Sequence, residues 1–389
     1  MNNRISSIDI FRALTMLLMI FVNDLWTLHA IPGWLEHTGA REDGMGLADV
    51  VFPAFLFIVG LSIPFAIDAR IKRGDSRKDI LLHIFTRTLA LVLMGFYMVN
   101  FENIRDDVPY FIRTTWEVLM LISFMLIWNQ YGQKRAGPFP VWSLRLTGVI
   151  ILLMLAMFYK GGTVENPAWM SPRWWGILGL IGWAYLVCSL VYLAAHNRPW
   201  IIVAGLLVFH ALNMLEFVPS GIPLPRFLLM VSASNHALVM SGVVATTLFM
   251  QLSAVKGHRF ELILLSLAIV SFSYGFAVRP LWGISKIMAT PSWTAICAGI
   301  SFGMYLVIYL VADVWHVTAW SKPIMPAGRS TLTCYLLPGL MYPLLYPLQQ
   351  LLHPAWLGGW PGLAKSLLFA LLVIVLTGVL DKRKVRMKI

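Results

Sequence analysis

Hydrophobic and polar positions alternate along this chain in long blocks, not in the short periods of amphipathic helices. Apolar runs near the ~20 residues that a bilayer-spanning helix needs recur from one end to the other, separated by short polar segments. This pattern predicts an all-α, polytopic integral membrane bundle of about twelve transmembrane helices, or as few as ten if short runs tilt or merge. The expected spans are residues 8–28, 49–67, 80–99, 114–130, 142–159, 174–195, 200–217, 235–254, 260–278, 292–314, 330–349 and 363–380.

Composition agrees with a membrane protein. Hydrophobic residues make up 59% of the chain and charged residues 12%, whereas soluble domains are about a quarter charged. The first run is longer than the roughly 7–15 apolar residues of a secretory signal and lacks a small-residue cleavage site, so we expect it to remain as a span. With no repeat of fixed period and no long polar linker, residues 1–389 should form a single membrane domain.

The basic residues indicate an orientation. The net charge is +12, but the lysines and arginines lie in short loops and form no single patch, so no nucleic-acid partner is expected. If the N-terminus is cytoplasmic, nineteen of the 30 fall on the cytoplasmic side, eight on the other, and Arg12, Arg87 and Lys365 inside spans. The positive-inside rule therefore predicts that both termini are cytoplasmic and that the loop carrying His29 and His37 faces outward.

The first apolar run carries polar residues, which are costly within a span and mark a functional site by default. Arg12 and Asn23 are eleven residues apart, so they lie within roughly 20° of one helix face and about 16 Å apart along the axis. This is typical of a helix that lines a cleft. Asp9 can pair with Arg12, and a purely structural ion pair is an equally acceptable interpretation.

Two loop histidines and one aspartate are candidates for proton transfer. A neutral imidazole can accept a proton, and a carboxylate can fix its tautomer, so His37 and Asp49 form a possible base and orienting pair. His29 is the second candidate. The alternatives are an ordinary surface histidine and an aspartate that only caps the second helix. The cysteines have no C-x-x-C spacing, and no motif for a metal or redox cofactor is present.

The string SIDIFRALTMLLMIFVN (7–23), a loop histidine and the string LADVVFPAFLFIVGLSI (47–63) follow one another. In this order they resemble the opening of the heparan-alpha-glucosaminide N-acetyltransferase family and its bacterial DUF5009-type relatives. The resemblance is strongest over residues 4–67, with weaker echoes at 284–314 and 326–339. It implies a bacterial cytoplasmic-membrane acetyltransferase that moves an acetyl group from cytosolic acetyl-CoA to the amino group of a terminal glucosamine-type sugar.

The resemblance also implies residue roles. The family's catalytic asparagine falls on Asn23 and its catalytic histidine on His37, with His29 as the fallback, and Asp49 would orient the histidine. Expected partners are the lipid bilayer, acetyl-CoA and a glycan acceptor, with a homodimer as a further expectation. Cations that could hold the acetyl-CoA phosphates are Arg12 with its partner Asp9, and the loop residues Lys72, Arg73 and Arg77, for which ordinary positive-inside topology is the alternative.

Two other functions stay open at this stage. One is an O-acyltransferase that modifies a hydroxyl of a surface glycan. The other is a secondary transporter with a midplane substrate site, although the two halves show no symmetry and the sixth and seventh runs are joined by a very short connection. The polar residues that would suit such a site are His210, Asn213, Glu216, Asn235, His236 and Asp313.

Overall fold

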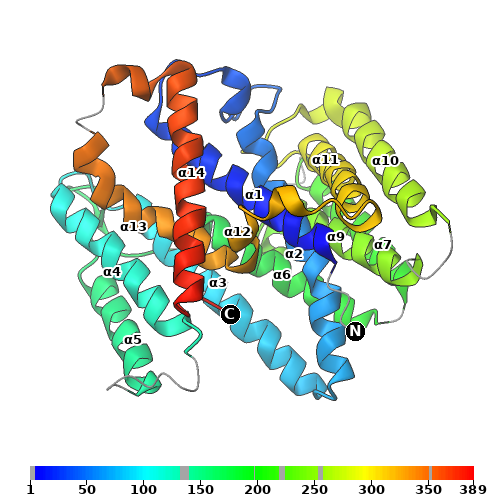
Figure 1. Cartoon of the computed structure of the whole chain (residues 1–389), viewed down its shortest axis with the longest axis horizontal. Coiled ribbons are helices and arrows are strands. Elements are labelled where there is room, and N and C mark those ends of the chain that lie inside the picture. The colour runs from blue at the N-terminus through cyan, green and yellow to red at the C-terminus, as the bar shows by residue number, and fades with distance from the viewer. Residues whose placement is uncertain (1–4, 132–139, 197, 219–223, 253–256, 350–352) are drawn as a thin grey trace.

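The computed structural model describes residues 5–131, 140–196, 198–218, 224–252, 257–349 and 353–389, which are almost entirely helical. Figure 1 shows the helices packed side by side as a bundle. The long helices are α1 (Ser6–Asp24), α2 (Leu47–Lys72), α3 (Arg77–Glu102), α4 (Tyr110–Trp128), α5 (Val141–Met157), α6 (Gly176–Ala194), α7 (Pro199–Leu215), α9 (Ala233–Leu252), α10 (Arg259–Trp282), α11 (Pro291–Tyr309), α13 (Thr331–Gln349) and α14 (Gly359–Lys382). Short elements are α8 (Leu224–Leu229), α12 (Met325–Arg329), a π-helical turn (Leu310–Val314), and the two-residue strands β1 (Gly161–Gly162) and β2 (Pro167–Ala168).

Each predicted apolar run coincides with one long helix, and a helical membrane bundle is therefore confirmed. Among the described helices, eight are long and apolar enough to cross a membrane, and α5 and α7 are shorter apolar helices. The boundaries differ at the first hairpin. The first helix ends at Asp24 because a 3₁₀ turn follows at Leu25–Thr27, and the second begins at Leu47 and continues to Lys72.

Helices α2 and α9 form the centre of the bundle, whereas α10 lies at its edge. In the most apolar window of each helix, 78% of α9 but only 22% of α10 is buried within the protein. The exposed face of α10 carries apolar side chains such as Leu265 and Ile269. In a bilayer, lipid would cover that face.

The central crossing of α2 and α9 depends on two glycines. A Cβ atom on Gly60 would lie 1.9 Å from the Val239 carbonyl oxygen, and one on Gly242 would lie 2.0 Å from the Phe57 carbonyl oxygen. The two backbones are therefore in direct contact, as small residues permit in membrane helix pairs. This contact fixes the position of α2, which carries Asp49.

Helix α1 is anchored at both ends by residues from the last quarter of the chain. The amides of its first two residues donate to the Asp313 carboxylate at 2.9 and 3.0 Å, which satisfies N–H groups that a helix leaves unpaired. At its other end, the buried Asp24 carboxylate lies 3.1 Å from Lys365 Nζ. The same carboxylate accepts hydrogen bonds from Ser366 Oγ and the Tyr342 hydroxyl.

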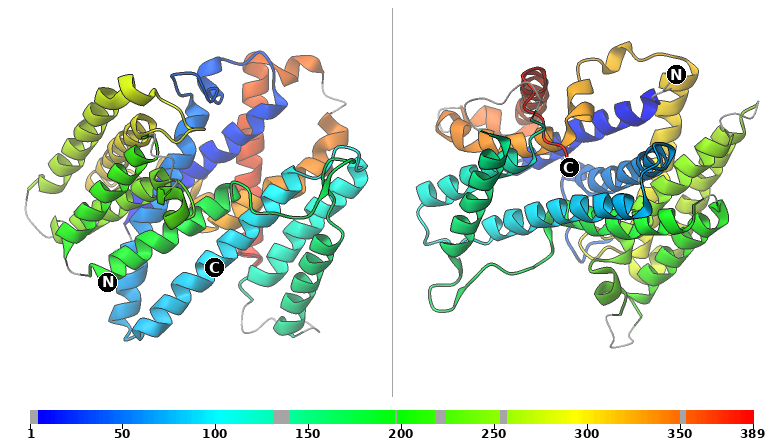
Figure 2. Two further views of the ribbon diagram at one scale, coloured as in Figure 1. Left: turned by 180° about the vertical axis from the view of Figure 1, so that it is seen from behind. Right: turned by 90° about the horizontal axis from the view of Figure 1, so that it is seen from below.

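The bundle has two distinct ends. In Figure 1 both chain termini and the turn between α2 and α3 lie at the lower end, while the loop between α1 and α2 lies at the upper end. Figure 2 shows the same separation from behind. The loop that carries His37 is thus at the opposite end from the termini.

Candidate active site

His37 and Asp49 come together at the upper end of the bundle, and we call them the dyad. His37 Nδ1 lies 2.6 Å from Asp49 Oδ1, and the Asp49 side chain is 1% exposed while that of His37 is 52% exposed. Since a carboxylate only accepts hydrogen bonds, Nδ1 is the protonated nitrogen of a neutral His37. Its Nε2 lone pair then remains available on the exposed side.

Local backbone geometry holds the dyad. Asp49 Oδ2 accepts hydrogen bonds from the amides of Thr38 and Gly46, each at 3.0 Å. The alternative role of Asp49 as a cap of α2 is also present: Gly46 is the N-cap residue, and Asp49 caps the helix from the third position of its first turn. A Cβ on Gly46 would lie 1.9 Å from the Glu36 carbonyl oxygen, so only glycine lets the loop close this tightly.

A lysine from a distant part of the chain completes the cluster. Lys286, in the loop between α10 and α11, places Nζ 3.2 Å from His37 Nδ1, 3.4 Å from His37 Nε2 and 3.9 Å from Asp49 Oδ1. In the plane of the His37 ring, an atom 3.2 Å from Nδ1 and 3.4 Å from Nε2 would collide with Cε1. The Lys286 ammonium therefore lies over the face of the ring. Burial lowers the pKa of Lys286, and the Asp49 charge opposes that shift.

A set of contacts between loops holds Lys286 in place. Asp43 accepts a hydrogen bond from the Ile284 amide at 2.7 Å and from Arg279 Nε at 3.0 Å. Ser285 Oγ donates to the Ala40 carbonyl oxygen at 3.0 Å. The Ile284 amide and then Arg279 lower the pKa of Asp43, so the carboxylate is held in its charged form.

Asn23 and His29 occupy different surroundings from the dyad. Asn23, at the end of α1, is exposed, and none of the hydrogen bonds found among the described residues joins it to His37. The His29 backbone pairs with the segment before α14, where its amide donates to the Leu357 carbonyl oxygen at 2.9 Å. Within the described ranges no carboxylate pairs with the His29 ring, so the geometry favours His37 as the base.

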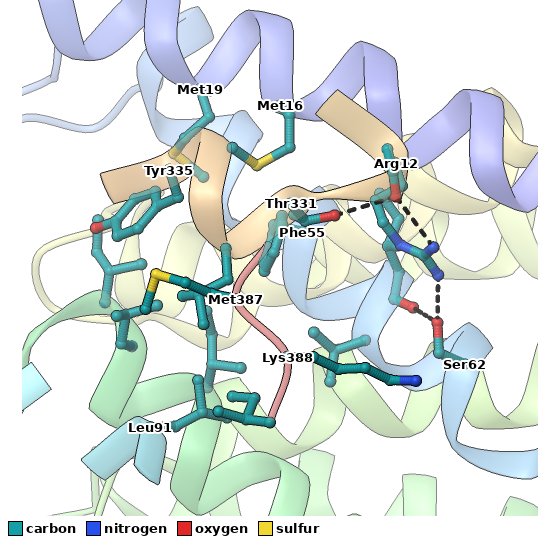
Figure 3. A pocket seen from close by; sticks show the side chains of 18 of the residues that line it. Arg12, Met16, Met19, Phe55, Ser62, Leu91, Thr331, Tyr335, Met387 and Lys388 are labelled. Carbon is teal, nitrogen blue, oxygen red and sulfur yellow. Dashed lines mark hydrogen bonds between the residues drawn. The ribbon is translucent and has the colours of Figure 1, made fainter. Parts of the chain in front are cut away.

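Arg12 lines a cavity of about 340 Å³ in the lower half of the bundle, which we call the Arg12 cavity. Figure 3 shows Arg12 at the upper right, Met16 and Met19 at the top, and Lys388 below them. Arg12 donates to Ser62 Oγ at 2.7 Å and pairs with Asp9 at 3.2 Å, so the predicted pair is present. The cavity lining combines basic and apolar side chains. Its basic residues are Arg12, Arg87, Arg329, Arg386 and Lys388.

Helix α2 connects the Arg12 cavity with the dyad. Ser62, beside Arg12, is 13 residues beyond Asp49, which is about 20 Å along a helix. Phe55, also in the cavity wall, is only six residues beyond Asp49, or about 9 Å. The part of α2 that lines the cavity thus begins about 9 Å along the helix from Asp49, and neither His37 nor Asp49 is among the lining residues.

The other cations that were predicted to hold the acetyl-CoA phosphates lie elsewhere. Lys72, Arg73 and Arg77 are exposed around the turn between α2 and α3 and are not among the residues that line the Arg12 cavity. Arg87 does line it, whereas the sequence indicates only that this residue lies inside a span. Over the part of the chain that is described, no group of three His, Cys, Asp or Glu side chains is placed to hold a metal ion.

Three of the polar residues that suggested a transporter serve helix contacts, whereas His210 Nδ1 is buried without a hydrogen-bond partner among the described residues. Asp313 caps α1. Glu216 accepts from the Ala233 amide at 2.6 Å, and Asn213 Oδ1 accepts from Thr294 Oγ1 at 3.1 Å. These groups serve separate helix contacts, which weakens the transport interpretation.

Comparison with known proteins gives two findings. Residues 4–220 match the family model described as a domain of unknown function, DUF5009. The chain is also similar to heparan-alpha-glucosaminide N-acetyltransferase of Mus musculus, with 34% identity over 102 residues, and of Homo sapiens, with 35% over 101 residues. Each alignment covers 25% of this chain and 14% of the relative, so the chain matches only a small part of these proteins' length.

Proposed function

Because the chain belongs to the DUF5009 family and is a distant relative of the heparan-alpha-glucosaminide N-acetyltransferases, we propose that it transfers acetyl groups from cytosolic acetyl-CoA to an amino sugar. Its similarity to these enzymes supports a membrane acetyltransferase in general terms. The acceptor we propose is the amino group of a terminal glucosamine-type sugar of a glycan on the outward side. The observation that carries this proposal is the arrangement along α2, which has the dyad at one end and a cation-lined cavity toward its other end.

The Arg12 cavity suits the two chemically different parts of acetyl-CoA. Phosphate groups bind guanidinium and ammonium groups through charge-assisted hydrogen bonds, and Arg12, Arg87 and Arg386 line the cavity. The pantetheine arm would follow the apolar wall of Met19 and Phe55 toward the dyad. In this arrangement the thioester would reach His37 from the cytoplasmic side.

The dyad supplies the proton chemistry that acetyl transfer needs. His37 Nε2 would accept the proton from the attacking amine, and Asp49 would keep His37 in the correct tautomer. Asn23 would donate its amide hydrogens to the carbonyl or orient the acceptor. Its exposed position at the end of α1 supports contact with a ligand.

The proposed topology is a single domain of twelve spans, residues 1–389, in a bacterial cytoplasmic membrane with both termini inside. Two observations support it. The termini lie at one end of the bundle together with the basic turn between α2 and α3. The dyad lies at the opposite end, where an outward acceptor would enter.

The test uses purified protein in liposomes with radiolabelled acetyl-CoA and glucosamine. We expect N-acetylglucosamine as product, with losses of about 10²–10⁴-fold in His37→Ala and about 10²–10³-fold in Asn23→Ala. His29→Ala is the matched control and should keep most activity. An O-acetylated product would indicate the glycan O-acyltransferase, and uptake of unmodified sugar would indicate a transporter. Full activity in His37→Ala would overturn the histidine-base mechanism.

A further inference from the structure

The groups around the Lys286 ammonium compensate its positive charge only in part. The described residues place two kinds of group near its Nζ, the His37 ring at 3.2 and 3.4 Å and the Asp49 carboxylate at 3.9 Å. The carboxylate lies beyond hydrogen-bonding distance, and the ring presents its face, where neither nitrogen has a lone pair. The N–H groups of Lys286 are therefore available to a further acceptor.

The position of this ammonium relative to His37 matches the geometry of acyl transfer. A reacting amine must lie within about 3 Å of the base, and the oxygen of a tetrahedral intermediate within about 3 Å of its stabilising donor. In that intermediate the amine nitrogen and the oxygen are bonded to the same carbon. His37 Nε2 and Lys286 Nζ are 3.4 Å apart, so both contacts can form at once.

We propose that Lys286 is a catalytic residue whose ammonium binds the oxyanion formed when the acceptor attacks the acetyl thioester. This inference rests on the acetyl transfer proposed above and adds a residue to it. The Lys286 side chain is 25% exposed, on the side where His37 is also exposed, so a substrate can contact both.

The amine nitrogen bonds to the thioester carbon and transfers one proton to His37 Nε2, while the carbonyl electron pair moves onto oxygen and is held by Lys286. The oxyanion then collapses, the carbon–sulfur bond breaks, and the coenzyme A thiolate takes the proton from His37. The products are an amide and free coenzyme A.

Electrostatics favour this role. The Asp49 carboxylate is buried, so an oxyanion forming near it would meet a fixed negative charge. The Lys286 ammonium offsets that charge, and such an interaction is strong in a site from which water is largely excluded. A structural role alone does not require this placement, because Asp43, Arg279 and Ser285 already hold the two loops together.

The experiment compares the wild type with Lys286→Met and Lys286→Arg in liposomes. The concentrations of acetyl-CoA and glucosamine are varied in turn. Lys160→Met is the matched control, because Lys160 is an exposed lysine of another loop. We expect Lys286→Met to lose about 10²–10³-fold in kcat with little change in either KM. Lys286→Arg should recover part of the activity, and Lys160→Met should equal the wild type.

A binding measurement separates this inference from the proposed function. Coenzyme A carrying a methylphosphonate group on sulfur places anionic oxygens where the oxyanion would form. Lys286→Met should bind this analogue at least about tenfold more weakly than the wild type, yet bind coenzyme A itself equally well, which also reports a folded protein. If the wild type transfers no acetyl group, the proposed function fails, and this measurement still tests Lys286. An unchanged kcat, a loss confined to the acceptor KM, or equal binding of the analogue would each overturn the inference.

Discussion

Replacing Asp49 with asparagine tests the dyad with the smallest possible change of shape. The two backbone amides of Thr38 and Gly46 both donate to Oδ2, whereas His37 Nδ1 contacts Oδ1. An asparagine can place its carbonyl oxygen at Oδ2 and so keep both backbone hydrogen bonds. Its NH₂ group then lies at the Oδ1 position, opposite a His37 N–H.

Two donors cannot face each other at 2.6 Å, so His37 must change tautomer. Nδ1 then becomes the acceptor and Nε2 carries the hydrogen, which removes the lone pair that would act as the base. The same replacement in serine protease triads lowers kcat about 10⁴-fold, and we expect a loss of that order. The cost in stability should be smaller, since one hydrogen bond to a charged group contributes about 1.5–3 kcal/mol.

The assay is steady-state acetyl transfer in liposomes combined with thermal unfolding. Asp49→Asn should lose kcat with little change in the acetyl-CoA KM. Asp49→Ala, which removes all three hydrogen bonds, is the comparison and should unfold at a lower temperature than Asp49→Asn. A kcat for Asp49→Asn within about tenfold of the wild type would refute the tautomer argument.

Three further outcomes follow from the contacts described. Arg12→Ala should raise the acetyl-CoA KM much more than the acceptor KM, whereas Lys72→Ala should change neither; equal effects of both variants would remove Arg12 from the donor site. Because the pKa of Asp43 is lowered by folding, its stabilisation is present above the unfolded value of about 3.9 and is lost as pH falls through the folded pKa. Asp43→Asn should therefore flatten the acid side of a melting-temperature profile against pH, and an unchanged profile would contradict this. A cysteine at position 41 should react with a membrane-impermeant thiol reagent from outside, and one at position 74 only after permeabilisation; the reverse would invert the topology.

The helices and the dyad could be predicted from the sequence because both depend on nearby residues. Long apolar runs identify spans by composition alone. His37 and Asp49 are twelve residues apart and joined by a glycine-rich loop, so their pairing needs only a local turn. The exact cap position of Asp49 could not be predicted, because it depends on how closely Gly46 approaches the Glu36 carbonyl oxygen.

Lys286 and Arg87 were missed for a different reason. Lys286 is 249 residues from His37 in the sequence, and no local pattern indicates that two outward loops meet. Arg87 was visible as a charge within a span, yet its position in the cavity depends on how α3 packs against its neighbours. One signal was available: the weaker echoes of the family, 284–314 and 326–339, contain Lys286 and several residues of the Arg12 cavity.

The double anchoring of α1 has a consequence for the order in which the protein assembles. Chains are made from the N-terminus onward, so the first helix enters the membrane with Asp9, Arg12 and Asp24 long before Lys365 exists. A charge without its partner is costly in the bilayer, and α1 is not among the eight helices that qualify as spans by length and composition. Asp24 therefore lacks its ion-pair partner, and the first amides of α1 lack their acceptor, until the last quarter of the chain has been made. The helix that carries Arg12 and Asn23 is thus made first but gains these stabilising contacts last.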